Sequence, residues 1–519
     1  MFRLSTQSLV KGQWLQVLKM PLKVTRIPGG RMFSVQDSLP RLPVPPIAQT
    51  MDKFLESVQP LLSEEELQQT HRVVKEFVKS DGPKLQVLLE ERSNKKINWL
   101  SDWWRDIAYL ESRLPVSINV NPGVVFPRQN YSSHADQLRF AAKVVAAVLD
   151  YKVMVDEQSL PVEQLGGKPL CMIQYYQILT GCRIPGKKKD SWTCFPPDGS
   201  DPPRHIVIIH NNTMFSLDVY GHDGKPLNVE QIYQQLLKIV DESPQKVAPL
   251  GLLTMEGRDN WSKQYHKLIK DKTNKASMDT IQRSIFVLCL DQPVGTHEEY
   301  AEERSIAAKA MLHGGGSDLN SGNRWFDKTL QFIVGANGTC GLNYEHTTAE
   351  GPAIVSLMDH ILGFSEKNVE ISLPAGGAKP PQKLNFNLSP DILQNIVDAK
   401  QHADAMINDV DLKVFRFDGF GKNFPKSVKM SPDAFIQIAL QLAYFRLHGE
   451  PCATYETGSL RRFQLGRTDT IRSCTVASHN FTKAMEDSKA TREQKVDLLR
   501  NAIVMHRKYT DEVINGRGN

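Results

Sequence analysis

His346 and Glu350 are the pair of residues in this sequence whose types and spacing best suit proton transfer. The imidazole of histidine has an ordinary pKa of about 6.5, so it can take up and release a proton near neutral pH. If the turn between the two residues is helical, they share one face, and the carboxylate orients the imidazole and stabilises its cation. The pair resembles a catalytic triad without its own nucleophile, which would then belong to a substrate. A histidine that only caps a helix is the alternative that the spacing leaves open.

The segments around His346 predict a β-hairpin followed by a helix. Residues 330–334 form a short apolar run typical of a strand, and Asn337-Gly338 is a strong hairpin signal. Residues 340–344 can return as the second strand. Pro352 suits the first turn of a helix, and apolar residues follow it at helical spacing. His346 is therefore expected where a strand hands over to a helix, from which a side chain can project into a cleft.

The nine residues Tyr344-Glu345-His346-Thr347-Thr348-Ala349-Glu350-Gly351-Pro352 resemble the active-site signature of the choline/carnitine acyltransferase family. Further motifs of that family occur in the family's order, at 39–46, 166–170, 258–261 and 322–328. The resemblance extends from about residue 38 nearly to the end of the chain.

The resemblance implies an enzyme that moves an acyl group reversibly between coenzyme A and the hydroxyl of carnitine, with His346 as the general base. It points to the carnitine-using branch that transfers short acyl groups, with coenzyme A or acetyl-CoA as a substrate and no metal. A medium-chain carnitine acyltransferase, a choline acyltransferase and a catalytically inactive form that binds coenzyme A or carnitine are the alternatives.

A second stretch, 421–433, joins several lysines to the start of a predicted helix, which Ser431 would cap and Pro432 would begin. Ammonium groups before a helix N-terminus form an anion site, because the exposed N–H groups add to their charge. A solvated basic loop explains the residues equally well. The matching family stretch binds coenzyme A. The residues that the resemblance assigns to coenzyme A are Lys422, Lys426, Ser427, Val428, Lys429, Met430, Ser431, Pro432, Asp433 and, further along the chain, Arg507.

A third group consists of the hydroxyl side chains of Tyr455, Thr457 and Thr468, which are neutral donors suited to a carboxylate. Taken alone, they belong only to a predicted strand and turn. In the carnitine-using branch the matching positions bind the carboxylate of carnitine, and 468–470 (Thr-Asp-Thr) resembles that branch. Choline enzymes differ there, because choline has no carboxylate.

The composition, with 40% apolar and 23% charged residues, is that of an ordinary globular protein. A net charge of +5 over 519 residues does not argue for a nucleic-acid partner. Seven cysteines without a C-x-x-C pair argue against a disulfide framework or a zinc site and fit a reducing compartment. No apolar run is long enough for a transmembrane helix. We expect small-molecule substrates and a monomer.

Residues 1–36 contain basic residues but no acidic residue, since the first acid is Asp37. Hydroxyl and scattered apolar residues complete the segment. This composition is typical of a mitochondrial transit peptide and predicts a location on the matrix side. A disordered basic tail is the alternative.

The alternation of strand-like and helical segments predicts an α/β or α+β protein. Helices are expected over 47–80 and, as an amphipathic helix, over 134–150. Strands are expected at 206–209, 216–220 and 285–290.

The resemblance implies an α/β fold of two domains related to chloramphenicol acetyltransferase, with an active-site tunnel between them. In that scheme 38–98 is an N-terminal helical segment that packs with the second domain. The first α/β domain, which carries the catalytic histidine, is 99–385, and the second is 386–519. Family members continue beyond the position of Asn519, so the second domain is expected to be incomplete and turnover by this polypeptide uncertain.

Two other groups of residues are predicted to be structural. The first is an ion-pair cluster of Arg324, Asp327 and Lys328. The second is a set of tryptophans expected to pack in the core, Trp99, Trp103 and Trp104.

Overall fold

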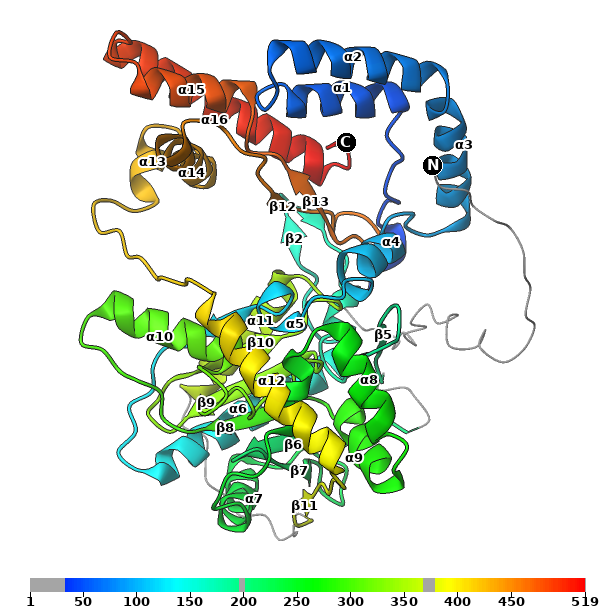
Figure 1. Cartoon of the computed structure of the whole chain (residues 1–519), viewed down its shortest axis with the longest axis vertical. Helices are drawn as coiled ribbons and strands as arrows, with labels where there is room; N and C mark the ends of the chain where they lie inside the picture. The colour runs from blue at the N-terminus through cyan, green and yellow to red at the C-terminus, as the bar shows by residue number, and fades with distance from the viewer. Residues whose placement is uncertain (1–32, 196–200, 367–378, 519) are drawn as a thin grey trace.

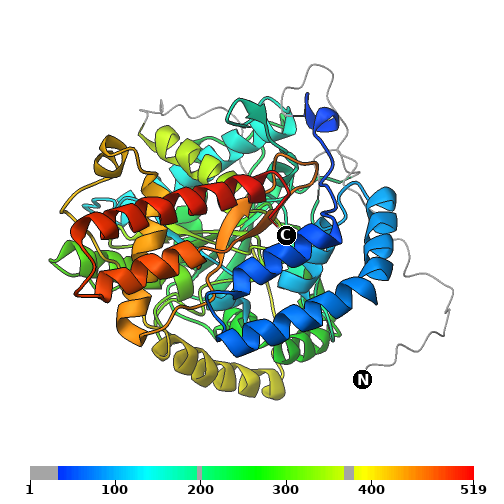
Figure 2. The ribbon, with the colours of Figure 1, turned by 90° about the horizontal axis from the view of Figure 1, so that it is seen from above.

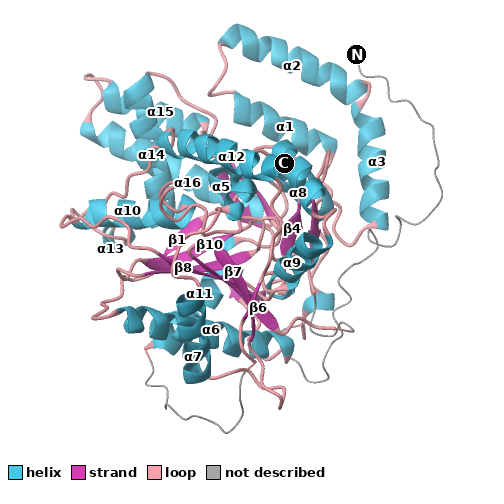
Figure 3. Cartoon of the chain, turned by 60° about the horizontal axis from the view of Figure 1, so that its bottom comes forward, coloured by secondary structure: helices cyan, strands magenta, loops and turns pink. Residues whose placement is uncertain are grey.

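The computed structural model describes residues 33–195, 201–366 and 379–518 and has a mixed α/β fold around one seven-stranded sheet (Figures 1 and 3). The predicted transit peptide therefore lies almost entirely outside the described residues. The sheet consists of β1 (Gly123–Val125), β6 (His205–His210), β7 (Thr213–Asp218), β8 (Val287–Asp291), β9 (Leu330–Gly335), β10 (Cys340–Tyr344) and β11 (Gln382–Lys383). Short two-stranded pairs are formed by β2 (Gln164–Leu165) with β3 (Lys168–Pro169), β4 (Cys182–Ile184) with β5 (Ser191–Thr193), and β12 (Glu456–Ser459) with β13 (Thr468–Ile471).

Helices make up most of the remaining regular structure. The α-helices are α1 (Ile47–Val58), α2 (Glu64–Lys79), α3 (Gly82–Lys95), α4 (Ser101–Arg105), α5 (Val116–Asn119), α6 (His134–Asp156), α7 (Val229–Glu242), α8 (Arg258–Leu268), α9 (Lys272–Arg283), α10 (Tyr300–His313), α11 (Gly351–Ser365), α12 (Pro390–Asn408), α13 (Asn423–Ser427), α14 (Pro432–His448), α15 (Val476–Glu486) and α16 (Arg492–Ile514). Three short 3₁₀-helices are η1 (Gln36–Ser38), η3 (Ile173–Tyr176) and η4 (Leu250–Met255), and η2 (Asp106–Leu110) is a π-helix.

The large sheet has the strand order β1-β10-β9-β8-β6-β7-β11. Its centre is parallel, since β8 runs parallel to both β6 and β9, whereas the outer pairs are antiparallel. The predicted hairpin is confirmed as β9–β10, with Phe332 opposite Leu342. Gly338 in its turn has φ of +86°, and a side chain there would collide with the carbonyl of Gln129. The tight turn and this close approach both require glycine.

Both faces of the sheet are buried, because alternate side chains of each strand point to opposite layers. Ile206 and Ile208 join the core formed with α6, α7 and α11, while Val207 and Ile209 join the core on η4, α8, α9 and α12. The strands predicted at 206–209 and 285–290 are confirmed as the central strands β6 and β8, with small shifts at their ends.

The helix predicted over 134–150 is longer than expected and is not amphipathic. As α6 it continues to Asp156, and side chains around most of its circumference are buried. Contacts with α7 and α11 as well as with the sheet explain this burial, because few of its faces remain for solvent. The helices predicted within 47–80 are confirmed as α1 and α2, including the capping box between Ser63 and Glu66.

The last helix of the layer over the sheet is α12. Ile392, Ile396 and Ala399 on this helix are buried in the core that contains η4 and α8. The boundary predicted between residues 385 and 386 therefore falls before a helix whose packing partners belong to the first part of the chain. After α12, residues 409–422 lead to a smaller layer made of α14, α15, α16 and the β12–β13 hairpin (Figure 1).

The N-terminal helix α1 lies beside the C-terminal helix α16 (Figure 2). Lys53 on α1 forms an ion pair with Glu512 on α16, and Gln49 donates to the carbonyl of Arg517 at 3.4 Å. Leu42 is buried against Leu460 and Phe463. These contacts join the two ends of the described chain.

The apolar side chains of α14 and α16 differ in burial. Ile438 and Ile503 are buried between the helices, whereas Ile436 is 58% and Leu440 56% exposed. Within the described residues, no helix combines the length and apolarity needed to cross a membrane. All seven cysteines are free thiols.

Two structural predictions need correction. Trp103 is 42% exposed and carries the guanidinium of Arg92 over its ring, so it is a surface residue and not part of the core. Arg324, Asp327 and Lys328 are buried, but each pairs with a different partner and not with the other two.

Candidate active site

His346 lies in the turn that joins β10 to α11, as the sequence predicted. The turn is not helical, however, because Glu350 has the extended backbone of an N-cap residue and α11 begins only at Gly351. The expected shared helical face is therefore wrong. The turn still brings the two side chains near each other, with Nε2 of His346 3.8 Å from Oε2 of Glu350. That separation permits electrostatic interaction but is too long for a hydrogen bond.

Tyr109, on η2, is the direct hydrogen-bond partner of His346. Its hydroxyl lies 3.1 Å from Nδ1, and the two rings are nearly parallel, with centroids 5.4 Å apart. The ring of Tyr344 lies at the same centroid distance, 5.4 Å, and is tilted. The side chain of His346 is 20% exposed, so the imidazole is held by aromatic neighbours and remains accessible.

Both tyrosines stay neutral over the physiological pH range. Burial, followed by the charge of Glu350, raises the pKa of Tyr109 far above its usual range. The same two causes raise the pKa of Tyr344 to about 12. The phenol of Tyr109 can therefore donate to Nδ1 or accept from it, according to the tautomer of His346.

Arg467, in the segment just before β13, holds the turn from the other side. Its Nε lies 2.6 Å from Oε1 of Glu350, Nη1 donates to the carbonyl of Thr347 at 2.6 Å, and Nη2 donates to the carbonyl of His346 at 3.1 Å. The guanidinium also lies 5.4 Å from the centre of the Tyr109 ring. Arg467 thus joins the β12–β13 hairpin to the turn that carries His346.

A buried ion-pair network supports the turn from below. Arg183 contacts Glu345, the residue before His346, at 3.2 Å and donates to the carbonyl of Tyr109 at 2.7 Å. It therefore fixes the backbone of the residue that stacks on the imidazole and the side chain of the residue that precedes it. Its Nε also pairs with Asp190 at 2.7 Å, and Arg258 continues the network from Asp190 to Asp327. Arg258 and Asp327 lie in the 258–261 and 322–328 motifs, which therefore have a structural role here.

The other two members of the predicted cluster have separate partners. Arg324 forms a bidentate pair with Asp291, with both oxygens at 2.6 Å. Lys328 donates to the carbonyls of Gln282 and Ser284. Burial lowers the pKa of Lys328 to about 8.

The residues predicted to bind carnitine lie on and beside the β12–β13 hairpin. Thr457 pairs with Thr470 and Ser459 with Thr468, so Thr457 and Thr468 point to the same face of the hairpin. Thr468 is buried directly after Arg467, and Tyr455 is 54% exposed and accepts from Thr457 at 3.2 Å. The hairpin therefore groups Thr457 and Thr468 on one of its faces, and Thr468 follows in sequence the arginine that contacts the His346 turn.

The residues predicted to bind coenzyme A precede and begin α14. Residues 423–427 form the short helix α13 within the predicted loop, and Ser431 caps α14 as expected, accepting from the backbone of Ala434 at 3.4 Å. The four basic side chains of this set are exposed, and they lie immediately before α13, on α13, in the segment after it and on α16. They are Lys422, Lys426, Lys429 and Arg507. Their ammonium and guanidinium groups are therefore available to an anion.

Asp433, the last residue of that stretch, meets Glu456 and His506, and one donor atom from each lies within 4.8 Å of the others. Glu456 accepts from His506 at 2.7 Å and from Ser473 at 2.8 Å. Burial and the charge of Glu456 raise the pKa of Asp433. The contact connects the predicted coenzyme A stretch to β12 and to the helix that carries Arg507.

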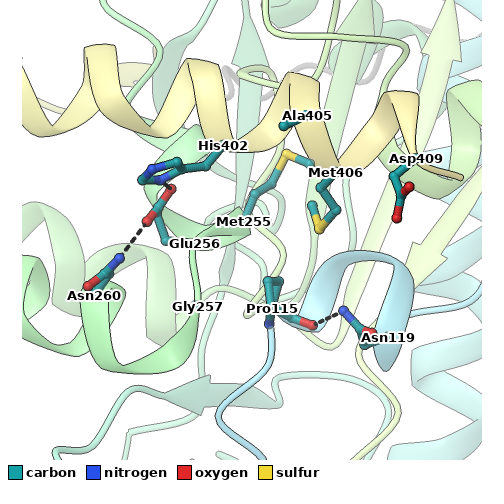
Figure 4. Close-up of a pocket in the computed structure, with 10 residues that line it drawn as sticks. All are labelled: Pro115, Asn119, Met255, Glu256, Gly257, Asn260, His402, Ala405, Met406 and Asp409. Carbon is teal, nitrogen blue, oxygen red and sulfur yellow. Dashed lines mark hydrogen bonds and ion pairs between the residues drawn. The ribbon is translucent and has the colours of Figure 1, made fainter.

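A surface cavity of about 590 Å³ lies between α12, α8 and α5 (Figure 4). Its buried carboxylate, Glu256, accepts from His402 at 2.9 Å and from Asn260 at 3.1 Å. Met255 and Met406 form its apolar wall. None of the residues that the sequence predicts for catalysis, coenzyme A or carnitine lines this cavity.

Comparison with known proteins identifies relatives along almost the whole chain. The human carnitine O-acetyltransferase is 53% identical over 491 residues, which are 94% of this chain and 78% of that protein. The carnitine O-acetyltransferase of Columba livia is 51% identical over 96% of this chain and 79% of its own length. The choline O-acetyltransferase of Danio rerio is 40% identical over 92% of this chain and 76% of its own length.

The profile of one protein family, described as choline/carnitine O-acyltransferase, matches residues 42–519. The match includes the turn of His346, the β12–β13 hairpin and the stretch before α14. With relatives of more than 50% identity along the same residues, it confirms the resemblance seen in the motifs. The chain is therefore a member of the choline/carnitine O-acyltransferase family.

Proposed function

We propose that this protein is a carnitine O-acetyltransferase, which moves a short acyl group reversibly between coenzyme A and the hydroxyl of carnitine. The similarity to proteins named carnitine O-acetyltransferase, at 51–53% identity, exceeds that to the choline O-acetyltransferases, at 38–40%. The observation that carries the proposal is the placement of His346. Its imidazole is accessible, held by Tyr109, and joined through Arg467 to the hairpin of Thr468.

His346 acts as the general base. With its proton on Nδ1, donated to the hydroxyl of Tyr109, the imidazole keeps a lone pair on Nε2. Nε2 takes the proton from the carnitine hydroxyl while the oxygen attacks the carbonyl of the acyl thioester. The tetrahedral intermediate collapses, the carbon–sulfur bond breaks, and the imidazolium returns the proton to the leaving thiolate. In the reverse direction, His346 takes the proton of the coenzyme A thiol. No covalent acyl-enzyme is required, because both substrates meet at one histidine.

Coenzyme A binds along the segment from α13 to α14. The exposed ammonium groups of Lys422 and Lys426 contact its phosphates, and Arg507 on α16 adds a third cation. Residues 427–433 contact the rest of the coenzyme A molecule, and this stretch ends at Asp433 beside Glu456. This placement is supported by the contact between Asp433, Glu456 and His506, which joins the basic segment to the strand next to Tyr455.

Carnitine binds between His346 and the β12–β13 hairpin, with its carboxylate on the hydroxyls of Tyr455, Thr457 and Thr468. Neutral donors on one face of a hairpin suit a carboxylate without adding a charge near the base. The face shared by Thr457 and Thr468 and the position of Thr468 beside Arg467 support this assignment.

The two substrates enter a tunnel between two domains related to chloramphenicol acetyltransferase. The first domain contains the seven-stranded sheet and α12, and the second contains α14, α15, α16 and the hairpin, joined to the N-terminal helices. We place the boundary in 409–422, because α12 packs on the first domain. Contacts of Arg467 across the boundary support a site between the two domains.

The direct test is incubation of the purified chain with acetyl-CoA and either carnitine or choline, followed by mass spectrometry of the products. Acetylcarnitine as the main product supports the proposal. Acetylcholine as the main product, or preference for medium-chain acyl-CoA over acetyl-CoA, would replace it with the corresponding alternative. Binding of coenzyme A without any ester product would indicate a catalytically inactive binding form.

A further inference from the structure

Arg467 makes three polar contacts with the segment that carries His346, one from each guanidinium nitrogen. The acceptors are a carboxylate oxygen of Glu350 at 2.6 Å and the carbonyls of Thr347 at 2.6 Å and His346 at 3.1 Å. The Arg467 side chain is 9% exposed, and so is that of Glu350, so the pair is largely shielded from solvent. A rigid, planar fork of donors is needed to reach three acceptors at once, which a lysine ammonium cannot reproduce.

The two carboxylate oxygens of Glu350 lie next to different charged or ionisable side chains. One of its oxygens is bound by Arg467, whereas the other lies 3.8 Å from Nε2 of His346 without a hydrogen bond. An opposite charge at this distance favours the protonated imidazole, and the guanidinium offsets that effect. The charges of Glu350 and Arg467 therefore oppose each other beside Nε2 of His346.

The other titratable groups around His346 do not alter this balance. Tyr109 from η2 and Tyr344 from β10 face the imidazole as neutral phenols. Glu345, the preceding acid, is fully buried and bound by Arg183, so its charge is compensated within the network below the turn.

We propose that Arg467 is a positioning residue that holds the His346 turn and, by compensating Glu350, sets the pH range over which His346 can act as a base. The inference rests on the proposed function, since it needs a reaction in which His346 must be unprotonated. This arrangement differs from a direct Glu350–His346 pair, in which the carboxylate would interact only with the imidazole.

The test measures kcat/KM for acetyl transfer to carnitine as a function of pH, because its acid limb reports ionisation in the free enzyme. In Arg467→Gln, the uncompensated carboxylate favours the imidazolium, so we expect the acid limb to move to higher pH by about 1 unit. In Glu350→Gln, the guanidinium is left alone and disfavours the imidazolium, so the limb moves to lower pH. The double variant, which lacks both charges, returns close to the parental limb.

Two further variants separate charge from geometry. Arg467→Lys keeps the positive charge but cannot bind both carbonyls, so it lowers kcat while its acid limb stays near the parental position. Arg461→Gln is the matched control, because Arg461 is a buried arginine of the same region that pairs with Glu163 at 2.6 Å and makes no contact with His346. We expect it to lower the melting temperature without moving the limb.

The outcomes are distinguishable from failure of the proposed function. If acetyl transfer by the parental enzyme does not depend on His346, the proposed function fails. If transfer depends on His346 but the limb is unmoved in both Arg467→Gln and Glu350→Gln, the role of Arg467 is overturned and the proposed function stands. Should Arg467→Gln fail to fold, the shift in Glu350→Gln and the unchanged limb of Arg467→Lys decide the matter by themselves.

Discussion

The hydroxyl of Tyr109 lies 3.1 Å from Nδ1 of His346, and the planes of the two rings differ by only 11°. Tyr109 therefore limits the imidazole in two ways, by stacking on its face and by contacting one ring nitrogen. The arrangement leaves Nε2 as the nitrogen available to a substrate, provided that the proton resides on Nδ1.

Replacing Tyr109 by phenylalanine keeps the stacked ring and removes the hydroxyl. A single hydrogen bond contributes about 0.5–1.5 kcal/mol, so we expect kcat to fall by roughly tenfold at most, with little change in the KM of either substrate. Steady-state kinetics check this expectation. Tyr151→Phe is the control, because Tyr151 is a buried tyrosine whose hydroxyl bonds Ser356 at 3.1 Å, away from the site. Equal effects of the two substitutions would argue against a specific role for Tyr109.

Lys422→Ala and Lys426→Ala are expected to weaken the binding of coenzyme A and leave that of carnitine almost unchanged. The loss should be larger at low salt than at high salt, because ions already screen the parental contacts at high salt. Calorimetry with each ligand at two salt concentrations measures both effects. Lys489→Ala serves as the control, since Lys489 is also exposed but lies between α15 and α16. Equal losses for both ligands would point to misfolding and not to a phosphate site.

His210 predicts how stability depends on pH. Burial lowers its pKa to about 4 from an ordinary 6.5, so the unfolded chain binds more protons than the folded one between these values. The contribution of His210 to the free energy of unfolding is complete above pH 6.5. It is lost as the pH falls towards 4, by up to about 3 kcal/mol.

Thermal or urea unfolding between pH 7 and 4 tests this dependence. His210→Asn should unfold more easily at pH 7, because a packed side chain is truncated, yet should lose less stability than the parent on acidification. His222→Asn changes an exposed histidine and should follow the parental curve. A parental acid sensitivity retained in full by His210→Asn would exclude His210 as its source.

Residues 1–36, fused to a fluorescent reporter, are expected to direct it to mitochondria. The segment is basic and free of acids, and import of such segments depends on positive charge. Changing Arg3, Lys11 and Lys19 to glutamate should leave the reporter in the cytosol. Exchanging the same three residues between arginine and lysine keeps their charge and should preserve import. Import that survives the glutamate changes would remove the charge argument.

Local signals in the sequence predicted the scaffold around His346 correctly. The Asn337-Gly338 pair gave the β9–β10 hairpin, since few other residues accept its backbone geometry. Pro352 placed the start of α11 within one residue. Such signals work because they depend on the conformational limits of a few adjacent residues.

The position of Pro352 in the first turn of α11 also predicts that the residues before Gly351 are not helical. A helix that begins at Gly351 leaves Glu350 as its N-cap, outside the helix. The four-residue spacing of His346 and Glu350 predicts a shared helical face only if this helix boundary is ignored. The side chains approach through the turn, and the observed 3.8 Å reflects that geometry.

Tyr109 and Arg467 could not be assigned these roles from local pattern. They reach His346 across 237 and 121 residues of sequence, and nothing in their own surroundings marks them as partners of a histidine. The burial of α6 on most of its faces was missed for a related reason. Helical periodicity predicts where a helix lies along the chain, but the number of elements that cover it depends on the assembled fold.

The role of His346 as the general base of acetyl transfer is tested most directly by His346→Ala. Removing a general base typically costs about 10²–10⁴-fold in rate, so we expect acetylcarnitine formation to fall by that order. Binding of coenzyme A, measured by calorimetry on the same preparation, should remain close to the parental value because its proposed contacts lie on α13, α14 and α16. Loss of transfer with retained coenzyme A binding is the predicted result, and near-parental turnover by His346→Ala would show that His346 is not the general base.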